Sequence, residues 1–154
     1  MLNKVLVIFV LLSTMGCSKK TDSLFVNKKV EAEILSFVSE DRKSAEQSNN
    51  FKPPAYSLLL ENTKEGCRLV VFQDLEIDTA KSVGYFYFED IPIALYVFSD
   101  ECVSFVNMDR LSTDWDRLDE DLISGAFLTA YEPCLRVIWL NENGEILKVE
   151  DKRS

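Results

Sequence analysis

The sequence predicts an α+β domain with an N-terminal helix, a mostly antiparallel meander sheet of about five to seven short strands, a second amphipathic helix and a C-terminal β-hairpin. Three observations predict this class. Apolar residues between positions 25 and 45 recur at steps of three and four, which is the period of a helix. From position 56 the apolar runs become short and rich in β-branched and aromatic residues, with polar turns between them. The connections are short, so we expect neighbouring strands to pair in chain order.

The first helix is expected to run from Phe25 to about Ala45, with charged residues on the side opposite its apolar stripe. Pro53 and Pro54 cannot continue a helix, so the helix must end before them. The stripe consists of Val26, Val30, Ile34, Phe37 and Val38.

A first hairpin is expected next, because Tyr56–Glu61 and Cys67–Asp74 flank a polar turn at 62–66.

A second hairpin is expected from Val83–Phe88 and Ile91–Phe98, joined by a two-residue loop. Pro92 has no N–H to donate to a strand ladder, which favours an edge position or a longer loop. The two-residue loop would set Phe88 opposite Ile91, Phe86 opposite Ile93, and Gly84 opposite Leu95.

The next two elements are a short strand at Cys102–Asn107 and a helix at Thr113–Ser124. Thr113 is a suitable N-cap, and Asp114 and Asp116 lie in the first turn, where the helix dipole favours negative charge. Trp115, Leu118 and Leu122 share one face of this expected helix.

The C-terminal hairpin is expected to span Leu135–Glu150, because Asn143-Gly144 is the favoured dipeptide of a type I′ turn. Pairing outward from that turn sets Leu140 against Leu147, Ile138 against Val149, Trp139 against Lys148, and Arg136 against Asp151.

The first seventeen residues have the order of a secretory signal. Lys4 supplies a positive charge, Val5–Leu12 is an unbroken run of eight apolar residues, and small residues lead to Cys17. Eight apolar residues are too few to span a bilayer. The segment resembles the lipobox of bacterial lipoproteins in Thr14-Met15-Gly16-Cys17, although Thr14 stands where the family usually has leucine.

This resemblance implies cleavage before Cys17 and attachment of lipid to its sulfur. Residues 1–16 are then the signal peptide, 17–23 the lipidated cysteine and a short tether, and 24–154 a single globular domain. The alternatives are ordinary secretion, with Cys17 just beyond a signal-peptidase site, and an uncleaved anchor.

Composition excludes several classes of function. Without residues 1–16 the chain has 16 basic and 26 acidic residues, a net charge of −10, which argues against nucleic acid as a partner. The sequence has no histidine, which excludes Ser-His-Asp and Cys-His catalysis and removes a common metal ligand. We therefore expect no enzyme, no cofactor and no metal site.

Three cysteines remain beyond Cys17. In an oxidising compartment two of Cys67, Cys102 and Cys134 can form a disulfide, and the sequence does not choose among the three pairings. The alternative is three buried thiols that pack as small apolar residues.

Tyr85, Tyr87 and Tyr96 share one face of the expected sheet and are the candidate interaction face. The competing interpretation places them in a core covered by a helix.

Two groups of acidic residues are candidate sites. The five acids between positions 114 and 121 are interpreted as a solvated helix face rather than a cation site, because they lack the spacing of a calcium loop. Glu89 and Asp90 with Glu101 are a weak candidate for a glycosidase pair.

The resulting hypothesis is a non-catalytic protein of the bacterial cell envelope, held to the membrane by lipid on Cys17, that binds a protein or another envelope component. An immunity or inhibitor protein is one version, because an acidic domain suits a basic toxin or enzyme. The membrane is the outer one in a Gram-negative cell. The alternatives are a carrier of a small apolar ligand or glycan and, third, a carboxylate-dependent hydrolase.

Overall fold

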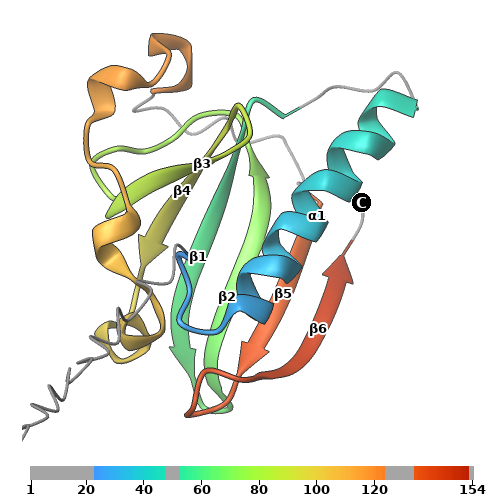
Figure 1. Cartoon of the computed structure of the whole chain (residues 1–154), viewed down its shortest axis with the longest axis vertical. Coiled ribbons are helices and arrows are strands. Elements are labelled where there is room, and N and C mark those ends of the chain that lie inside the picture. The colour runs from blue at the N-terminus through green and yellow to red at the C-terminus, as the bar shows by residue number, and fades with distance from the viewer. Residues whose placement is uncertain (1–22, 48–52, 124–133, 153–154) are drawn as a thin grey trace, which may run out of the picture.

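The computed structural model describes residues 23–47, 53–123 and 134–152, and these form an α+β fold, which confirms the predicted class. Within these residues one α-helix lies against a six-stranded sheet with the strand order β3-β4-β1-β2-β5-β6 (Figure 1). The elements are α1 (Lys28–Gln47), β1 (Ala55–Thr63), β2 (Gly66–Asp74), β3 (Gly84–Phe88), β4 (Ile91–Val97), β5 (Leu135–Leu140) and β6 (Ile146–Lys152). The described residues between β4 and β5 form four 3₁₀ helices, namely η1 (Asp100–Phe105), η2 (Met108–Arg110), η3 (Trp115–Arg117) and η4 (Glu120–Leu122).

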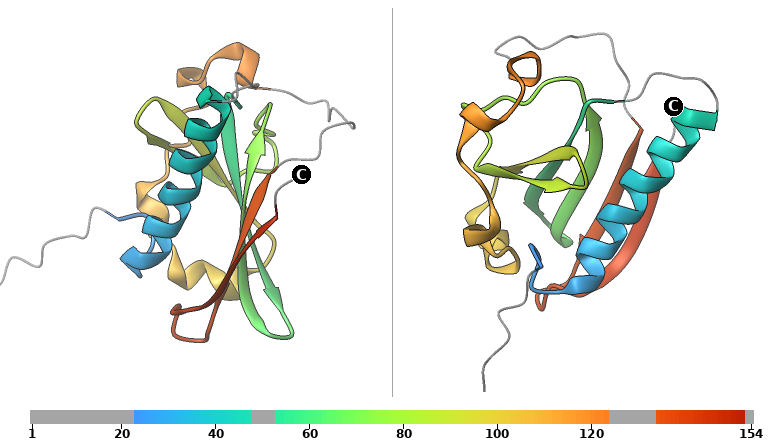
Figure 2. Two further views of the ribbon diagram at one scale, coloured as in Figure 1. Left: turned by 90° about the vertical axis from the view of Figure 1, so that its right-hand side faces the viewer. Right: turned by 45° about the horizontal axis from the view of Figure 1, so that its top comes forward.

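Helix α1 covers one face of the sheet with the stripe that the sequence predicts (Figure 2). The helix begins three residues later than expected, after Asn27, whose side-chain oxygen accepts the N–H of Lys29 at 3.1 Å. Val26 therefore lies outside the helix and is 61% exposed, contrary to its predicted place in the stripe. The buried stripe residues are Val30, Ile34, Phe37 and Val38.

Both predicted internal hairpins are confirmed. β1 and β2 pair antiparallel around the polar turn, from Ala55 opposite Asp74 to Thr63 opposite Gly66. β3 and β4 pair with the predicted register, including Phe88 opposite Ile91. The loop between them holds Glu89 at a φ of 56°, a left-handed conformation that non-glycine residues seldom adopt.

The predicted meander order is wrong. The β3–β4 hairpin lies beside β1 instead of following β2, and β4 runs parallel to β1 from Tyr56 opposite Ile93 to Leu60 opposite Val97. The other edge of β2 is already paired with β5. Pro92 accordingly lies in an internal strand, contrary to its predicted edge position, one residue before the pairing with β1 begins.

The predicted strand at Cys102–Asn107 and helix at Thr113–Ser124 are also wrong, since this region forms the four 3₁₀ helices. After η3 the backbone becomes extended at Leu118, with φ −80° and ψ 151°, and this side chain is buried. Ile123 forms a bridge to Ile77. Aspartate is a poor helix former, so burial of Leu118 and packing of the half-buried Ile123 outweigh the weak helical preference of the acidic segment. Ser124 lies outside the described residues.

The C-terminal hairpin is confirmed for three of its predicted pairs but not at its turn. Asn143 does not share the positive φ of Gly144 (73°), so the turn is not type I′. The N–H groups of Asn143 and Glu145 both donate to the side-chain oxygen of Asn141 at 2.9 Å, which favours a longer turn. A bulge follows, and Leu140 pairs with Ile146 instead of Leu147.

The two faces of the sheet carry separate apolar clusters, because side chains alternate along each strand. The larger cluster lies under α1 and includes Tyr56, Leu58 and Leu60 of β1. The smaller cluster, on the other face, contains Ala55, Ile77, Tyr85, Ala94, Tyr96 and Leu118.

A disulfide joins Cys67 at the start of β2 to Cys102 in η1, across 35 residues. This bond ties the 3₁₀ segment to the sheet. Cys134 is half-buried against the larger cluster. None of the helices in the described ranges is long and apolar enough to span a membrane.

Candidate interaction surface

The three tyrosines singled out by the sequence do not share an exposed face. Tyr85 is 1% exposed, and its hydroxyl donates to the backbone carbonyl of Asp114 at 2.8 Å. Tyr96 is 8% exposed, its hydroxyl oxygen accepts the N–H of Asp78 at 2.9 Å, and burial raises its pKa above the ordinary value. Tyr87 is 49% exposed. The structure thus places Tyr85 and Tyr96 in the smaller core cluster and leaves Tyr87 at the surface.

Tyr87 belongs to an aromatic stack that the sequence did not reveal as a unit. Its ring meets the ring of Tyr85 edge-on, with 5.6 Å between centroids, and Tyr85 lies 5.2 Å from the ring of Trp115. Trp115 is half-buried in η3. We call Tyr87 and Trp115, supported from beneath by Tyr85, the aromatic surface. Its two outer rings are held by packing, so a partner would meet a preorganised contact area.

The segment that carries Trp115 is mainly acidic. Asp114, Asp116, Asp119 and Glu120 are exposed, and Asp114 forms an ion pair with Arg117 at 3.5 Å. In the described part of the chain, no three acidic or cysteine side chains are grouped so that they could hold a metal ion. Exposed acids beside aromatic rings suit a partner that carries positive charge.

The carboxylates considered for a hydrolase lie far apart. Glu89 and Asp90 form the loop before β4, whereas Glu101 lies beyond the other end of that strand. A strand rises about 3.3 Å per residue, so the seven residues of β4 separate the two groups by roughly 20 Å. The side-chain amide of Asn62 donates to Glu101. Two carboxylates at this separation cannot act on one glycosidic bond.

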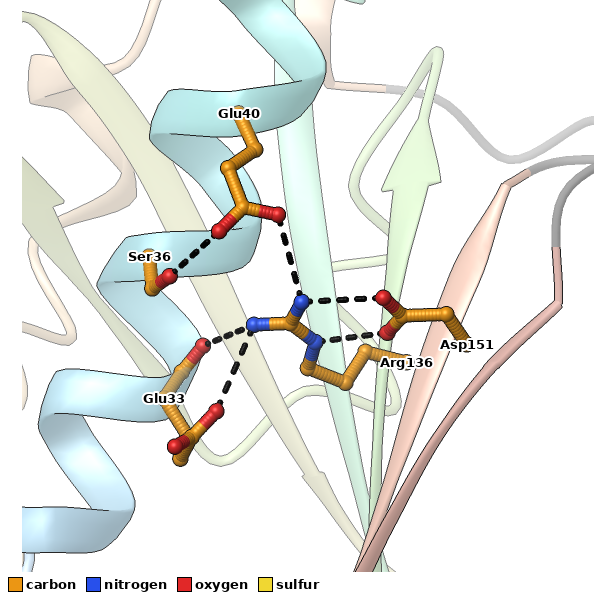
Figure 3. A network of polar contacts seen from close by, with 5 residues as sticks. All are labelled: Glu33, Ser36, Glu40, Arg136 and Asp151. Atoms are coloured by element: carbon orange, nitrogen blue, oxygen red, sulfur yellow. Dashed lines mark hydrogen bonds and ion pairs between the residues drawn. The ribbon is translucent and has the colours of Figure 1, made fainter.

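Among the described residues, Arg136 of β5 is a charged residue that is buried, with a side chain that is 7% exposed (Figure 3). Its Nε and Nη2 donate to the two carboxylate oxygens of Asp151 at 2.6 and 3.0 Å. The same guanidinium donates to the backbone carbonyl of Glu33 at 3.1 Å and contacts the carboxylates of Glu33 and Glu40 at 3.4 and 3.3 Å. Its cation also lies 5.5 Å from the centre of the Phe37 ring.

This network fastens α1 to the sheet. Arg136 and Asp151 come from β5 and β6, while Glu33 and Glu40 come from the helix. The hydrogen bond that Arg136 donates to Asp151, together with the charges of the acids, raises the pKa of Arg136 above its ordinary value, although burial opposes the rise. The hydroxyl of Ser36 donates to Glu40 at 2.8 Å and helps to orient it. Because the network joins α1 to β5 and β6 around a buried guanidinium, we infer that its role is structural.

Two further polar contacts lie between the elements. The hydroxyl of Tyr56 and the side-chain amide of Gln73 both donate to Asp41 of α1 at 2.7 Å. On the other face of the sheet, the buried hydroxyl of Ser57 donates to Asp74 at 2.5 Å. Burial raises the pKa of Asp74 above its ordinary value, and the Ser57 hydrogen bond opposes that rise.

Comparison of this chain with known protein families, curated proteins and solved structures finds no match.

We predict that Asp151→Asn lowers the free energy of unfolding by about 2 kcal/mol, because it removes the bidentate carboxylate from a buried guanidinium. Glu150→Gln is the matched control, since it removes one charge from the same strand at a surface ion pair with Lys148 and should cost less than about 0.5 kcal/mol. Urea denaturation measures both. Equal effects of the two substitutions would contradict the anchoring role of Arg136.

We predict that Asp74→Asn stabilises the protein more at pH 7 than at pH 3. Because the pKa of Asp74 is higher in the folded state, its contribution to stability is complete below the unfolded pKa and is lost as the pH rises through the folded pKa. Asparagine has no carboxyl group to ionise, so the variant does not lose this stability as the pH rises. Urea denaturation at both pH values measures the difference between variant and wild type, and an equal difference at the two values would be the contrary result.

Proposed function

We propose that this is a lipid-anchored, non-catalytic protein of the bacterial cell envelope that acts by binding a protein partner. The observation that carries the proposal is the order of residues 1–17, in which a charge and a short apolar run precede Thr14-Met15-Gly16-Cys17. The anchor would be lipid on Cys17, and the fold would begin a few residues later.

The start of the domain supports an anchor close to the fold. Ser23 and Leu24 are both held by Glu31 of α1, and the side-chain amide of Asn107 donates to the carbonyl of Ser23 at 2.7 Å. The six residues from 18 to 23 reach about 20 Å at most when fully extended. With lipid on Cys17, the domain would remain within that distance of its membrane.

The disulfide between Cys67 and Cys102 supports the same compartment. Disulfides persist in the oxidising surroundings of the periplasm and the cell surface, and they are rare in the cytosol.

The aromatic surface supports binding as the mode of action. Tyr87 is the exposed member of a packed stack, and aromatic residues contribute strongly to protein interfaces. The acids that flank Trp115 in the sequence and the net charge of −10 on residues 17–154 favour a basic partner, as expected of an immunity or inhibitor protein. A carrier is less well supported, because Tyr85 and Tyr96 pack among core residues. The absence of histidine from the sequence and the separation of Glu89 from Glu101 weigh against a hydrolase.

We predict that Cys17→Ala moves the protein from the membrane fraction to the soluble fraction of the cell. The wild-type protein should begin at Cys17 and carry the mass of its acyl chains, because a single chain binds a membrane only marginally and stable anchoring takes more than one. Cell fractionation and intact-mass spectrometry test the two statements. An unchanged distribution of the variant, or a mature chain without acyl mass, would rule out the lipid anchor.

We predict that Tyr87→Ala lowers recovery of the bound partner from detergent-solubilised envelopes by about tenfold or more, the loss typical of a central interface residue. Phe98→Ala is the matched control, because Phe98 is 67% exposed and lies outside the aromatic surface. Quantitative mass spectrometry of the captured proteins measures both. If both variants recover the same proteins as the wild type, the aromatic surface is not where the partner binds.

A further inference from the structure

The outer edge of β6 is an open sheet edge in the described part of the chain. β6 pairs with β5 on one side, and no described strand or bridge occupies its other side (Figure 1). The opposite edge of the sheet differs, because Tyr85 of β3 and Ser112 exchange two backbone hydrogen bonds of 2.9 and 2.7 Å. An open edge presents backbone donors and acceptors to another strand.

β6 also exposes apolar side chains. Leu147, at the bulge, is 60% exposed, and Val149, in the regular part of the strand, is 37% exposed, although both are large hydrophobic residues. Val149 pairs with Ile138 and lies on the face of the sheet that carries α1. Lys148 pairs with Trp139 and lies on the other face, as does Glu150.

The charges of β6 are complementary to a second copy of the same strand. Suppose that two copies of β6 pair antiparallel about a two-fold axis perpendicular to the sheet. Side chains of one face then stay on one face only if the axis passes beside a residue, so that this central residue lies opposite its own copy. If Val149 is the central residue, Lys148 of each copy lies opposite Glu150 of the other copy, which gives two pairs of opposite charge. Centring on Lys148, Glu150 or Asp151 places a charged residue opposite its own copy, which is unfavourable.

We propose that two copies of this chain pair through β6, antiparallel and centred on Val149, to form one continuous twelve-stranded sheet. Lys148 and Glu150 already form an ion pair within each strand, so pairing produces a square of four charges with alternating sign. The two copies of Val149 face each other on the α1 side, and Leu147 is covered at the same time. This dimer goes beyond the proposed function and does not depend on lipid at Cys17.

The test is sedimentation equilibrium of the complete mature chain with Cys17→Ala, in about 0.15 M salt, so that no micelle joins two copies. Val149→Lys and Leu147→Lys replace exposed apolar residues on one strand and change the net charge equally. At position 149 the introduced lysines face each other, whereas at position 147 each faces Asp151 of the second copy. We expect wild type to dimerise, Val149→Lys to raise the dissociation constant about tenfold or more, and Leu147→Lys not to raise it.

A charge exchange on the other face provides a second measurement, in case Val149→Lys fails to fold. Lys148→Glu should weaken the dimer about tenfold, and Lys148→Glu combined with Glu150→Lys should restore it. Wild type that remains monomeric at about 1 mM would overturn the proposal. So would equal weakening by the two lysine variants, or a combined variant no tighter than Lys148→Glu alone.

Discussion

Strand β1 is paired along both edges and covered on both faces, and the remainder of the fold is arranged around it. It pairs antiparallel with β2 and parallel with β4. Its side chains on one face pack under α1, and those on the other face contribute to the smaller cluster. Two of its hydroxyl-bearing residues are fully buried and donate to acids on neighbouring elements, Tyr56 to Asp41 and Ser57 to Asp74. Because β1 is enclosed in this way, it positions β2, β4 and α1 directly, and the other strands of the sheet attach to β2 and β4.

Attachment to this central strand determines which surfaces remain available. Arg136 fastens α1 to β5 and β6, so the helix covers the central part of that face of the sheet (Figure 3). The disulfide holds η1 on the same side as α1, since Cys67 and Cys102 belong to the larger cluster. Burial of Leu118 holds the segment after η3 against the opposite side. Among the described residues, Tyr87 above its aromatic stack and the outer edge of β6 remain accessible. The first supports binding of a different protein, and the second supports association with an identical chain, so the two surfaces need not compete.

Sequence patterns predict the elements whose determinants are local. The stripe of α1, both internal hairpins and the pairing of Arg136 with Asp151 follow from residue spacing and turn residues alone. Glu33 and Glu40 were missed as partners of Arg136 because about a hundred residues separate them from it. A signal was present, since an arginine within an apolar strand requires acids, and two acids seven residues apart share one face of a helix.

The misassigned elements depend on contacts that spacing does not encode. The segment from 113 to 123 has a helical apolar period, yet Leu118 and Ile123 reach the sheet only from an extended backbone. The position of β4 depends on which edge of the first hairpin is already occupied by β5, a strand about forty residues later in the chain. The alternation of side chains along β3 and β4 correctly places the three tyrosines on one face of the sheet. Whether another segment covers that face depends on the whole fold.

Native-state amide hydrogen exchange tests the central position of β1 most directly. If β1 is enclosed as described, the amides of Leu58, Leu59 and Leu60 exchange only through global unfolding, and their protection follows the free energy of unfolding measured with urea. In the monomer, amides on the outer edge of β6 should exchange much faster. Exchange in β1 that is as fast as in β6 and independent of global stability would contradict a fold built around this strand.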